Sequence, residues 1–281
     1  MITSWANGKI KRLVQLQEKS RARNGEGIFV AEGIKMFKEA PLSVLREVYV
    51  SEGLWHQGKE RLAEIEGKLA QCRERGIVVE QVSEEAFKKA ADTHTPQGVL
   101  FVAAQFSHTL PEMLGKALGR HQAGGRPPLF LLLEDVQDPG NLGTMLRTGE
   151  GAGVDGVIMA RGTADVYNPK TIRATMGSLY RVPFLYVDGL AETAAVLKEK
   201  NIAVYAAHLK GNQYFDEIPY KGGCAFLVGN EGSGLREETA ELADAYVKIP
   251  MEGELESLNA AVAAALLLYQ AAGSHRKRNG N

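Results

Sequence analysis

The chain has 281 residues, of which 44% are hydrophobic and 24% are charged, and its formal net charge is −1. This composition is typical of a globular protein with room for two domains, and it lacks the overall positive charge that would by itself indicate a nucleic-acid-binding protein. No run of about eighteen apolar residues occurs, and residues 1–9 lack the apolar core of a signal peptide, so we expect no membrane association. Cys72 and Cys224 show neither metal-ligand nor disulfide-framework spacing, and we expect a cytoplasmic protein.

Positive charge is concentrated at the start of the chain. Residues 1–24 hold six Lys and Arg side chains against a single acidic one, Glu18. A polyanion such as RNA could bind this basic edge, although a solvated helix face explains the charges equally well. The candidates for RNA contacts in this stretch are Lys11, Arg12, Arg21 and Arg23.

The first part of the chain alternates short strand patterns with helical ones. A charged amphipathic helix is predicted over Glu60–Arg75, and Ser83 is expected to cap the start of another helix. The predicted strands are Ile28–Ala31, Val48–Val50, Ile77–Val79 and Val99–Ala103. We therefore predict a small α/β domain over residues 1–106. Residues 107–128, rich in Gly, Pro, His and Arg, predict a linker with one short helix at Pro111–Leu118.

The second domain, residues 129–281, opens with the apolar run Leu129–Leu133, which is typical of a buried parallel strand. Regular alternation of strands and helices predicts a parallel sheet with helices on both faces. The further predicted strands are Gly156–Met159, Phe184–Val187, Val204–Ala207, Ala225–Gly229 and Tyr246–Ile249. The predicted helices between them lie near Leu142–Ala152, Pro169–Leu179, Leu190–Lys200 and Arg236–Leu242, and a last buried helix begins at Ala260.

Ligands of such sheets bind at the carboxyl ends of the strands, where three loops are unusual. The loop from Glu134 places Asn141 at the start of a helix, and Arg147 follows six residues later. Small residues in the turn before Arg147 permit close approach of a phosphate. A plain helix cap at Asn141 and a surface pair of Arg147 with Glu150 are the alternatives.

The second loop is Gly229–Leu235, which contains three glycines and the carboxylate of Glu231. The glycines permit positive φ angles and close contact with a ligand, although a simple tight turn explains them as well.

A third loop runs from Ile249 to Asn259 and leads into the last helix. We predict Ser257 as the N-cap of that helix. Backbone donors at a helix start commonly face a ligand, so Ser257 and Asn259 are candidates for one side of a binding site.

Several common motifs are excluded. Gly149–Gly153 matches the glycine pattern of ordinary nucleotide-binding methyltransferases, but it follows a predicted helix instead of a strand. There is no P-loop and no G-x-S-x-G nucleophile elbow. The histidines are scattered without the spacing of a zinc site, so no metal is expected.

In this order, the three loops resemble the SpoU (TrmH-like) family of RNA ribose 2′-O-methyltransferases. The matching motifs are Asp138-Pro139-Gly140-Asn141-Leu142-Gly143 with Arg147-Thr148, Gly229-Asn230-Glu231-Gly232-Ser233-Gly234-Leu235, and Ile249-Pro250-Met251 with Ser257-Leu258-Asn259. The first domain is similar to the family's RNA-binding domain through Phe29-Val30-Ala31-Glu32-Gly33 and Pro96-Gln97-Gly98, which adds Glu32 and Gln97 to the candidate RNA contacts. The chain departs from the family at Gly149 and Glu150, where alanine-rich sequence is commoner.

The resemblance implies a trefoil knot at the C-terminus, a homodimer formed through the second domain with its active site at the subunit boundary, and S-adenosylmethionine as cofactor. The implied cofactor-binding residues are Leu209, Gly229, Gly234, Ile249 and Leu258. The implied catalytic residues are Arg147, Asn141, Glu231, Ser257 and Asn259. The implied substrate is structured RNA, most often ribosomal RNA in relatives that carry such an appended domain.

Family accounts make the residue matching Arg147 the general base, but a guanidinium is effectively always charged. We therefore expect Arg147 to hold a phosphate and stabilise a developing alkoxide. The alternatives are a tRNA 2′-O-methyltransferase, a non-catalytic RNA-binding protein, and an NAD-dependent oxidoreductase, which would need a G-x-G-x-x-G motif after its first strand.

Overall fold

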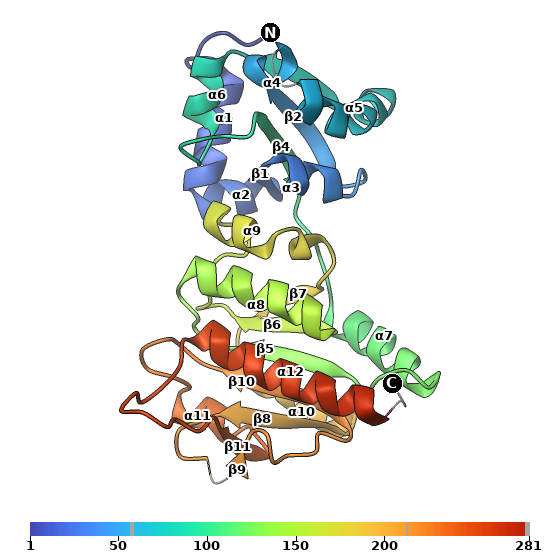
Figure 1. The fold of residues 1–281 in the computed structure, drawn as a ribbon, viewed down its shortest axis with the longest axis vertical. Helices are drawn as coiled ribbons and strands as arrows, with labels where there is room; N and C mark the ends of the chain where they lie inside the picture. Colours follow the sequence, from blue (N-terminus) through green and yellow to red (C-terminus); the bar gives the residue numbers. More distant parts are fainter. Residues whose placement is uncertain (57–58, 212, 279–281) are drawn as a thin grey trace. The chain divides into compact units, whose positions relative to one another are not determined.

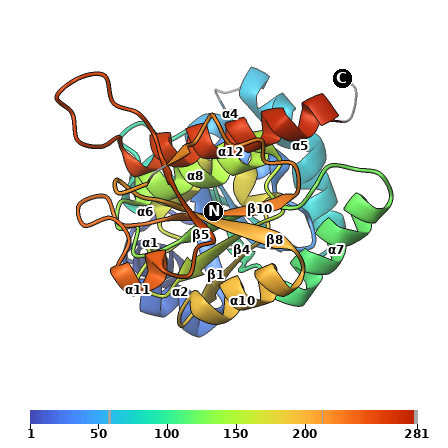
Figure 2. The same ribbon diagram turned by 90° about the horizontal axis from the view of Figure 1, so that it is seen from below.

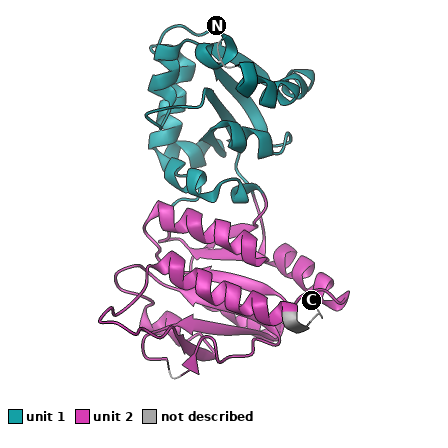
Figure 3. Ribbon diagram, viewed as in Figure 1, with its two compact units in different colours: residues 1–106, 165–180 teal, residues 107–164, 181–281 magenta. Residues whose placement is uncertain are grey.

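The computed structural model describes residues 1–56, 59–211 and 213–278. The chain forms two compact units (Figure 3): residues 1–106 with 165–180, and residues 107–164 with 181–281. Each unit has its own sheet and its own hydrophobic core. Among the described residues, no helix combines the length and the apolar character needed to cross a membrane.

The first unit is built on a four-stranded sheet in the order β1-β4-β2-β3. Strand β4 is antiparallel to β1 and β2, and β3 is parallel to β2. The strands are β1 (Ile28–Glu32), β2 (Leu45–Ser51), β3 (Val78–Val82) and β4 (Val99–Ala104). The helices are α1 (Gly8–Glu18), α2 (Ser20–Glu26), α3 (Ile34–Glu39), α4 (Glu52–His56), α5 (Lys59–Glu74), α6 (Glu84–Ala90) and α9 (Pro169–Thr175).

One core of this unit lies between the sheet and helices α1 and α6. Helix α1 buries Ile10, Leu13 and Leu16, whose spacing puts them on one helical face. Helix α6 begins at the predicted cap, since the Ser83 hydroxyl accepts a hydrogen bond from the Ala86 N–H. The strands seen here overlap those predicted from the sequence.

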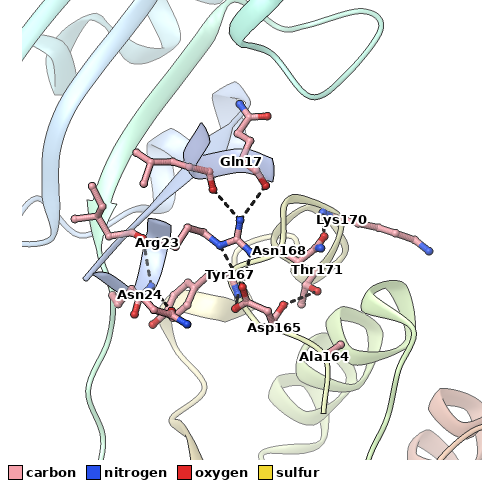
Figure 4. Close-up of polar contacts among 12 residues, drawn as sticks. Gln17, Arg23, Asn24, Ala164, Asp165, Tyr167, Asn168, Lys170 and Thr171 are labelled. Carbon is pink, nitrogen blue, oxygen red and sulfur yellow. Dashed lines mark hydrogen bonds and ion pairs between the residues drawn. The ribbon is translucent and has the colours of Figure 1, made fainter. Parts of the chain in front are cut away.

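A buried ion pair joins residues 165–180 to the first unit (Figure 4). Only 3% of the Arg23 side chain is exposed. Its Nε donates to Asp165 Oδ2 at 3.1 Å, and its Nη1 donates to the carbonyls of Leu16 at 2.7 Å and Gln17 at 2.9 Å. A buried guanidinium is stabilised only when its donors are satisfied in this way.

Aromatic packing holds the same segment. The Tyr167 ring stacks on Phe29 with centroids 4.9 Å apart, and its hydroxyl accepts a hydrogen bond from the Phe106 N–H at 2.6 Å. These contacts explain why the first unit differs from the predicted domain 1–106: residues 165–180, which lie within the predicted second domain, pack into it.

The second unit holds a seven-stranded sheet in the order β7-β6-β5-β10-β8-β11-β9, in which the recorded neighbours are parallel. The strands are β5 (Leu129–Leu133), β6 (Gly156–Ala160), β7 (Phe184–Val187), β8 (Ile202–Ala207), β9 (Gln213–Tyr214), β10 (Gly223–Val228) and β11 (Ala245–Lys248). The helices are α7 (Leu110–Gln122), α8 (Pro139–Ala152), α10 (Ala191–Glu199), α11 (Glu237–Ala240) and α12 (Ala260–Arg278). The predicted parallel-sheet α/β architecture is confirmed.

Helices cover both faces of this sheet (Figures 1 and 2). Helices α8 and α12 lie side by side on one face, while α7, α10 and α11 pack against the other. The stretch predicted as a linker, 107–128, therefore belongs largely to this unit. Helix α7 is longer than predicted because it starts with a Thr109–Glu112 capping box and buries Met113, Leu114 and Ala117 against the sheet.

Two predicted helix caps are wrong by a few residues. Helix α12 begins at Ala260, and the residue directly before it, Asn259, caps it by accepting from the Ala261 N–H at 2.9 Å, so Ser257 is not the cap. Helix α8 is capped by Asp138, which accepts from the Asn141 N–H at 2.8 Å, so Asn141 lies inside the first turn.

The helix predicted over Pro169–Leu179 ends early. Helix α9 stops at Thr175, because Met176 has a φ of +50° and Gly177 a φ of +99°. Left-handed residues of this kind terminate an α-helix.

The Arg23 pair makes a testable contribution to the stability of the first unit. We expect Arg23→Met to lower its free energy of unfolding by about 3 kcal/mol, because the substitution leaves the partly buried Asp165 carboxylate without its cation. Both tryptophans, Trp5 and Trp55, lie in this unit, so urea unfolding followed by tryptophan fluorescence measures it. The control is Arg21→Met, an exposed position on α2, which should change stability by no more than about 0.5 kcal/mol. Equal losses in the two variants would contradict the assignment.

Candidate functional site

A pocket lies in the second unit at the carboxyl ends of β8, β10 and β11, which are neighbours in the sheet. This is where ligands of open parallel sheets bind. The pocket is lined by all of the predicted cofactor-binding residues: Leu209, Gly229, Gly234, Ile249 and Leu258. Two of the predicted catalytic residues, Glu231 and Ser257, line it as well. The pocket thus brings together residues from the loops that follow β8, β10 and β11.

The loop after β10 is a tight turn closed by its own backbone. Asn230 and Gly234 exchange two N–H to carbonyl hydrogen bonds, each 3.0 Å long. The Asn230 side chain organises the tip by accepting from the N–H groups of Gly232 at 2.8 Å and Ser233 at 3.1 Å. A Cβ at Gly229 would lie 2.2 Å from the Gly234 carbonyl carbon, and Gly234 has a φ of +71°. The turn therefore needs glycine at both positions.

Glu231 fastens this turn to the loop after β5. Its carboxylate accepts hydrogen bonds from the N–H groups of Gln137 at 3.0 Å and Asp138 at 3.1 Å, and from Asn141 Nδ2 at 2.9 Å. Burial raises the pKa of the Glu231 carboxyl, but these hydrogen bonds outweigh it and hold the pKa below its ordinary value. Glu231 is therefore ionised at neutral pH and serves as an acceptor.

Asn141 extends the connection to the third loop. Its Oδ1 accepts from Asn259 Nδ2 at 2.9 Å, and Asn259 Oδ1 caps α12. A carboxylate can only accept and a helix N-terminus can only donate, so the ends of this chain of contacts fix how both amides are oriented. Glu231, Asn141 and Asn259 thus form one hydrogen-bonded row across the three loops.

Arg147 is not part of this row. It follows Asn141 by six residues on α8, which at 3.6 residues per turn puts it about 120° away around the helix. Its side chain is exposed and does not line the pocket. The alternative surface pair with Glu150 is not formed, since Glu150 pairs with Arg181. Within the described ranges, Arg147 has neither a hydrogen bond nor an ion pair from its side chain.

Two residues that organise the site were not singled out from the sequence. Asn230 holds the tip of the turn, and Glu134 fixes the backbone that leaves it by accepting from the Arg236 N–H at 2.8 Å. A signal for Glu134 exists in the sequence, because it is a carboxylate placed directly after five apolar strand residues.

The residues predicted to contact RNA divide into two groups. Lys11 and Arg21 are exposed. The others have partners inside the first unit: Arg12 pairs with Glu26 and Glu47, Arg23 is buried beside Asp165, Glu32 accepts from the Asp92 N–H, and Gln97 accepts from the Ile34 N–H. Their contacts with RNA remain predictions, and Arg23 is not presented at the surface.

No cluster of three or more metal-ligating side chains occurs in the part of the chain that the structure describes.

Comparisons with known proteins give a consistent result. The model of the SpoU rRNA Methylase family matches residues 128–269, and that of the MRM3-like substrate binding domain matches residues 7–101. The chain is 34% identical over 274 residues to the 23S rRNA (guanosine(2553)-2′-O)-methyltransferase RlmP of Bacillus subtilis, covering 97% of this chain and 99% of that one. It is 33% identical over 249 residues to the 23S rRNA (guanosine-2′-O-)-methyltransferase RlmB of Bordetella pertussis, covering 88% and 95%.

A solved structure agrees with these relatives. The AdoMet-bound rRNA methyltransferase from Sinorhizobium meliloti superimposes with a TM-score of 0.77 at 29% identity, covering 96% of each chain.

The closed turn after β10 is testable through its glycines. We expect Gly229→Ala to destabilise the turn by about 2 kcal/mol, because the new methyl group overlaps the backbone at Gly234. The loss should speed amide hydrogen exchange at Asn230 and Gly234 roughly thirtyfold. At Gly232 a Cβ would meet only Asn230 Oδ1, at 3.5 Å, so Gly232→Ala serves as the control and should leave exchange nearly unchanged. Unchanged exchange in Gly229→Ala would show that the turn is not held as described.

Proposed function

We propose, because the chain belongs to the SpoU rRNA methylase family, that it transfers a methyl group from S-adenosylmethionine to a ribose 2′-hydroxyl of ribosomal RNA. The observation that carries the proposal is the pocket at the ends of β8, β10 and β11, which is lined by residues of the second and third motif loops, while Asn141 of the first loop is hydrogen-bonded to Glu231 and Asn259. The relatives with full-length similarity are named as 23S rRNA 2′-O-methyltransferases, which supports the same reaction and the same class of substrate. A ribosomal RNA substrate is consistent with the predicted cytoplasmic location.

The residues that line the pocket fit S-adenosylmethionine. Leu209, Ile249 and Leu258 offer apolar surface for the adenosine, and the space at the Cβ position of Gly234 is open, with no atom within 4 Å. When bound, the cofactor supplies an electrophilic methyl group on its sulfonium. Binding mainly by backbone groups leaves the side chain of Glu231 to hold the loops together.

In the proposed reaction the protein acts chiefly by alignment and electrostatics. A ribose hydroxyl is a poor nucleophile, and aligning it removes a large part of the barrier. Arg147 would hold the neighbouring phosphate and stabilise the developing alkoxide, with the proton passing to phosphate or water. Asn141 and Asn259, already oriented by Glu231, would position the ribose, and Ser257 would contribute a hydroxyl at the mouth of the pocket.

A homodimer would complete this site. Val262, Leu266 and Tyr269 are exposed by 48%, 38% and 47% and share one face of α12. Tyr269 approaches Gly151 near the end of α8, so this apolar stripe continues onto the helix that carries Arg147. Pairing of this face with a second copy would bury the stripe and bring the partner's copy of Arg147 toward the pocket that lacks it.

The C-terminal trefoil knot belongs to the same proposal. Residues 249–259 leave the far side of the sheet after β11, line the pocket, and lead into α12, which packs against β5, β10 and α8. A C-terminal segment that crosses neighbouring strands in this way supports the threading implied by the family.

The first unit would bind the RNA. The match to a substrate binding domain over residues 7–101 supports this role, and Lys11 and Arg21 are the exposed cations of the predicted set. Contacts by such side chains to phosphates would be strongly dependent on salt.

The direct test is methyl transfer. We expect the purified protein with S-adenosylmethionine to methylate 23S rRNA at one ribose, seen as a single new stop in 2′-O-methyl mapping. Replacing Arg147 by Ala should lower the rate at least a hundredfold, in line with loss of an electrostatic stabiliser. Methylation of tRNA instead would support the alternative substrate, and RNA binding without any methyl transfer would support a non-catalytic role. Full activity in Arg147→Ala would remove Arg147 from the mechanism.

The subunit boundary is tested separately by mixing variants. In the proposed dimer, each site takes Asn259 from one subunit and Arg147 from the other. A co-refolded heterodimer of Arg147→Ala and Asn259→Ala should therefore have one site in which both residues are intact. We expect about a quarter of the wild-type activity, since random pairing makes half the molecules heterodimers. Each variant refolded alone is the control. No recovery on mixing, with dimers seen by light scattering, would place both residues' functions in the same subunit.

A further inference from the structure

We propose that Glu134 is a positioning residue for cofactor binding, which acts by holding the pocket turn after β10 in its receptive shape. Glu134 itself does not line the pocket. The inference rests on the proposed function, because it concerns affinity for S-adenosylmethionine.

Glu134 is a buried carboxylate with a full set of donors. Its side chain is 2% exposed. Oε2 accepts from the Arg236 N–H at 2.8 Å, and Oε1 accepts from Arg236 Nε at 2.8 Å and from the Thr239 hydroxyl. Such a charge is stable in the interior only while these donors remain in place. The Glu134 carboxylate therefore fixes the start of α11, and the donors of Arg236 and Thr239 stabilise the buried charge in return.

The place of this contact gives it a role beyond stability. Glu134 follows β5 directly, and its N–H donates to the Val228 carbonyl at the end of β10. The pocket turn occupies the residues between Val228 and Arg236. Glu134 thus contacts the entry of that turn through its backbone N–H and the exit through its carboxylate, so a single residue contacts both ends.

A second buried carboxylate in the same sheet provides a matched control. Asp155 is 7% exposed and accepts from Arg120, Arg126 and the Leu129 N–H, so it resembles Glu134 in burial and in its arginine partners. It lies at the start of β5 and β6, at the opposite end of the strands from the pocket. Loss of Asp155 should affect stability without reaching the turn.

The substitution Glu134→Gln keeps the shape of the side chain but replaces one acceptor with a donor that faces other donors. We expect the dissociation constant for S-adenosylmethionine, measured by isothermal titration calorimetry, to rise about tenfold, as for loss of hydrogen bonds to a charged group. The turnover number at saturating cofactor should change less than about twofold, because the catalytic groups are untouched. Asp155→Asn should lower the melting temperature and leave the dissociation constant unchanged.

Two further variants keep the test decisive if Glu134→Gln folds poorly. Thr239→Val replaces the hydroxyl that donates to Glu134 with a methyl group and should weaken cofactor binding, whereas Thr239→Ser keeps the hydroxyl and should bind the cofactor as the wild type does. Equal affinities in wild type, Glu134→Gln and Thr239→Val would overturn the inference, as would the same loss of affinity in Asp155→Asn. Failure of the wild-type protein itself to bind S-adenosylmethionine would instead overturn the proposed function.

Discussion

The site depends on two carboxylates at neighbouring strand ends. Each lies on one loop and accepts hydrogen bonds from the backbone of the other loop. Glu134, at the end of β5, reaches the backbone that leaves the turn after β10, and Glu231, in that turn, reaches back to the backbone of residues 137 and 138. Strands β5 and β10 pair in register, with Leu133 opposite Val228, so both loops start at the same level. Loop N–H groups that lack a strand partner need acceptors, and each loop receives its acceptor from the other.

This exchange also determines how the last helix is joined to the site. Once Glu231 is fixed as an acceptor, Asn141 must turn its amide nitrogen toward it and its oxygen toward Asn259. Asn259 uses its own oxygen to cap α12. The start of the C-terminal helix is therefore positioned by the row of contacts that begins at Glu231. The same contacts position residues 257–263, which form one wall of the pocket. Loss of the Glu231 carboxylate at one end of the row would therefore change how Asn259 is held at the other end.

The sequence predicted the strands of the parallel sheet and the convergence of the loops because these follow from short-range patterns and from the common edge where parallel strands end. It did not predict that residues 165–180 join the first unit, since the Arg23–Asp165 pair links positions far apart in the chain and no local pattern reports it. The caps at Asp138 and Asn259 were missed because several cap-forming residues stand close together before each helix, and only the observed helix start selects among them. The contacts of Glu134 could not be predicted, because they depend on where the fold places Arg236.

The separation of Arg147 from the row of Glu231, Asn141 and Asn259 has a chemical consequence. Glu231 already accepts three hydrogen bonds, close to the capacity of one carboxylate, so it does not need a guanidinium as its partner. Arg147 lies on another side of α8, where its guanidinium is exposed. Had Arg147 faced Glu231 within one chain, a salt bridge would compete with phosphate for the same donors. Within one chain, the exposed cation of Arg147 and the carboxylate that holds the loops therefore do not neutralise each other.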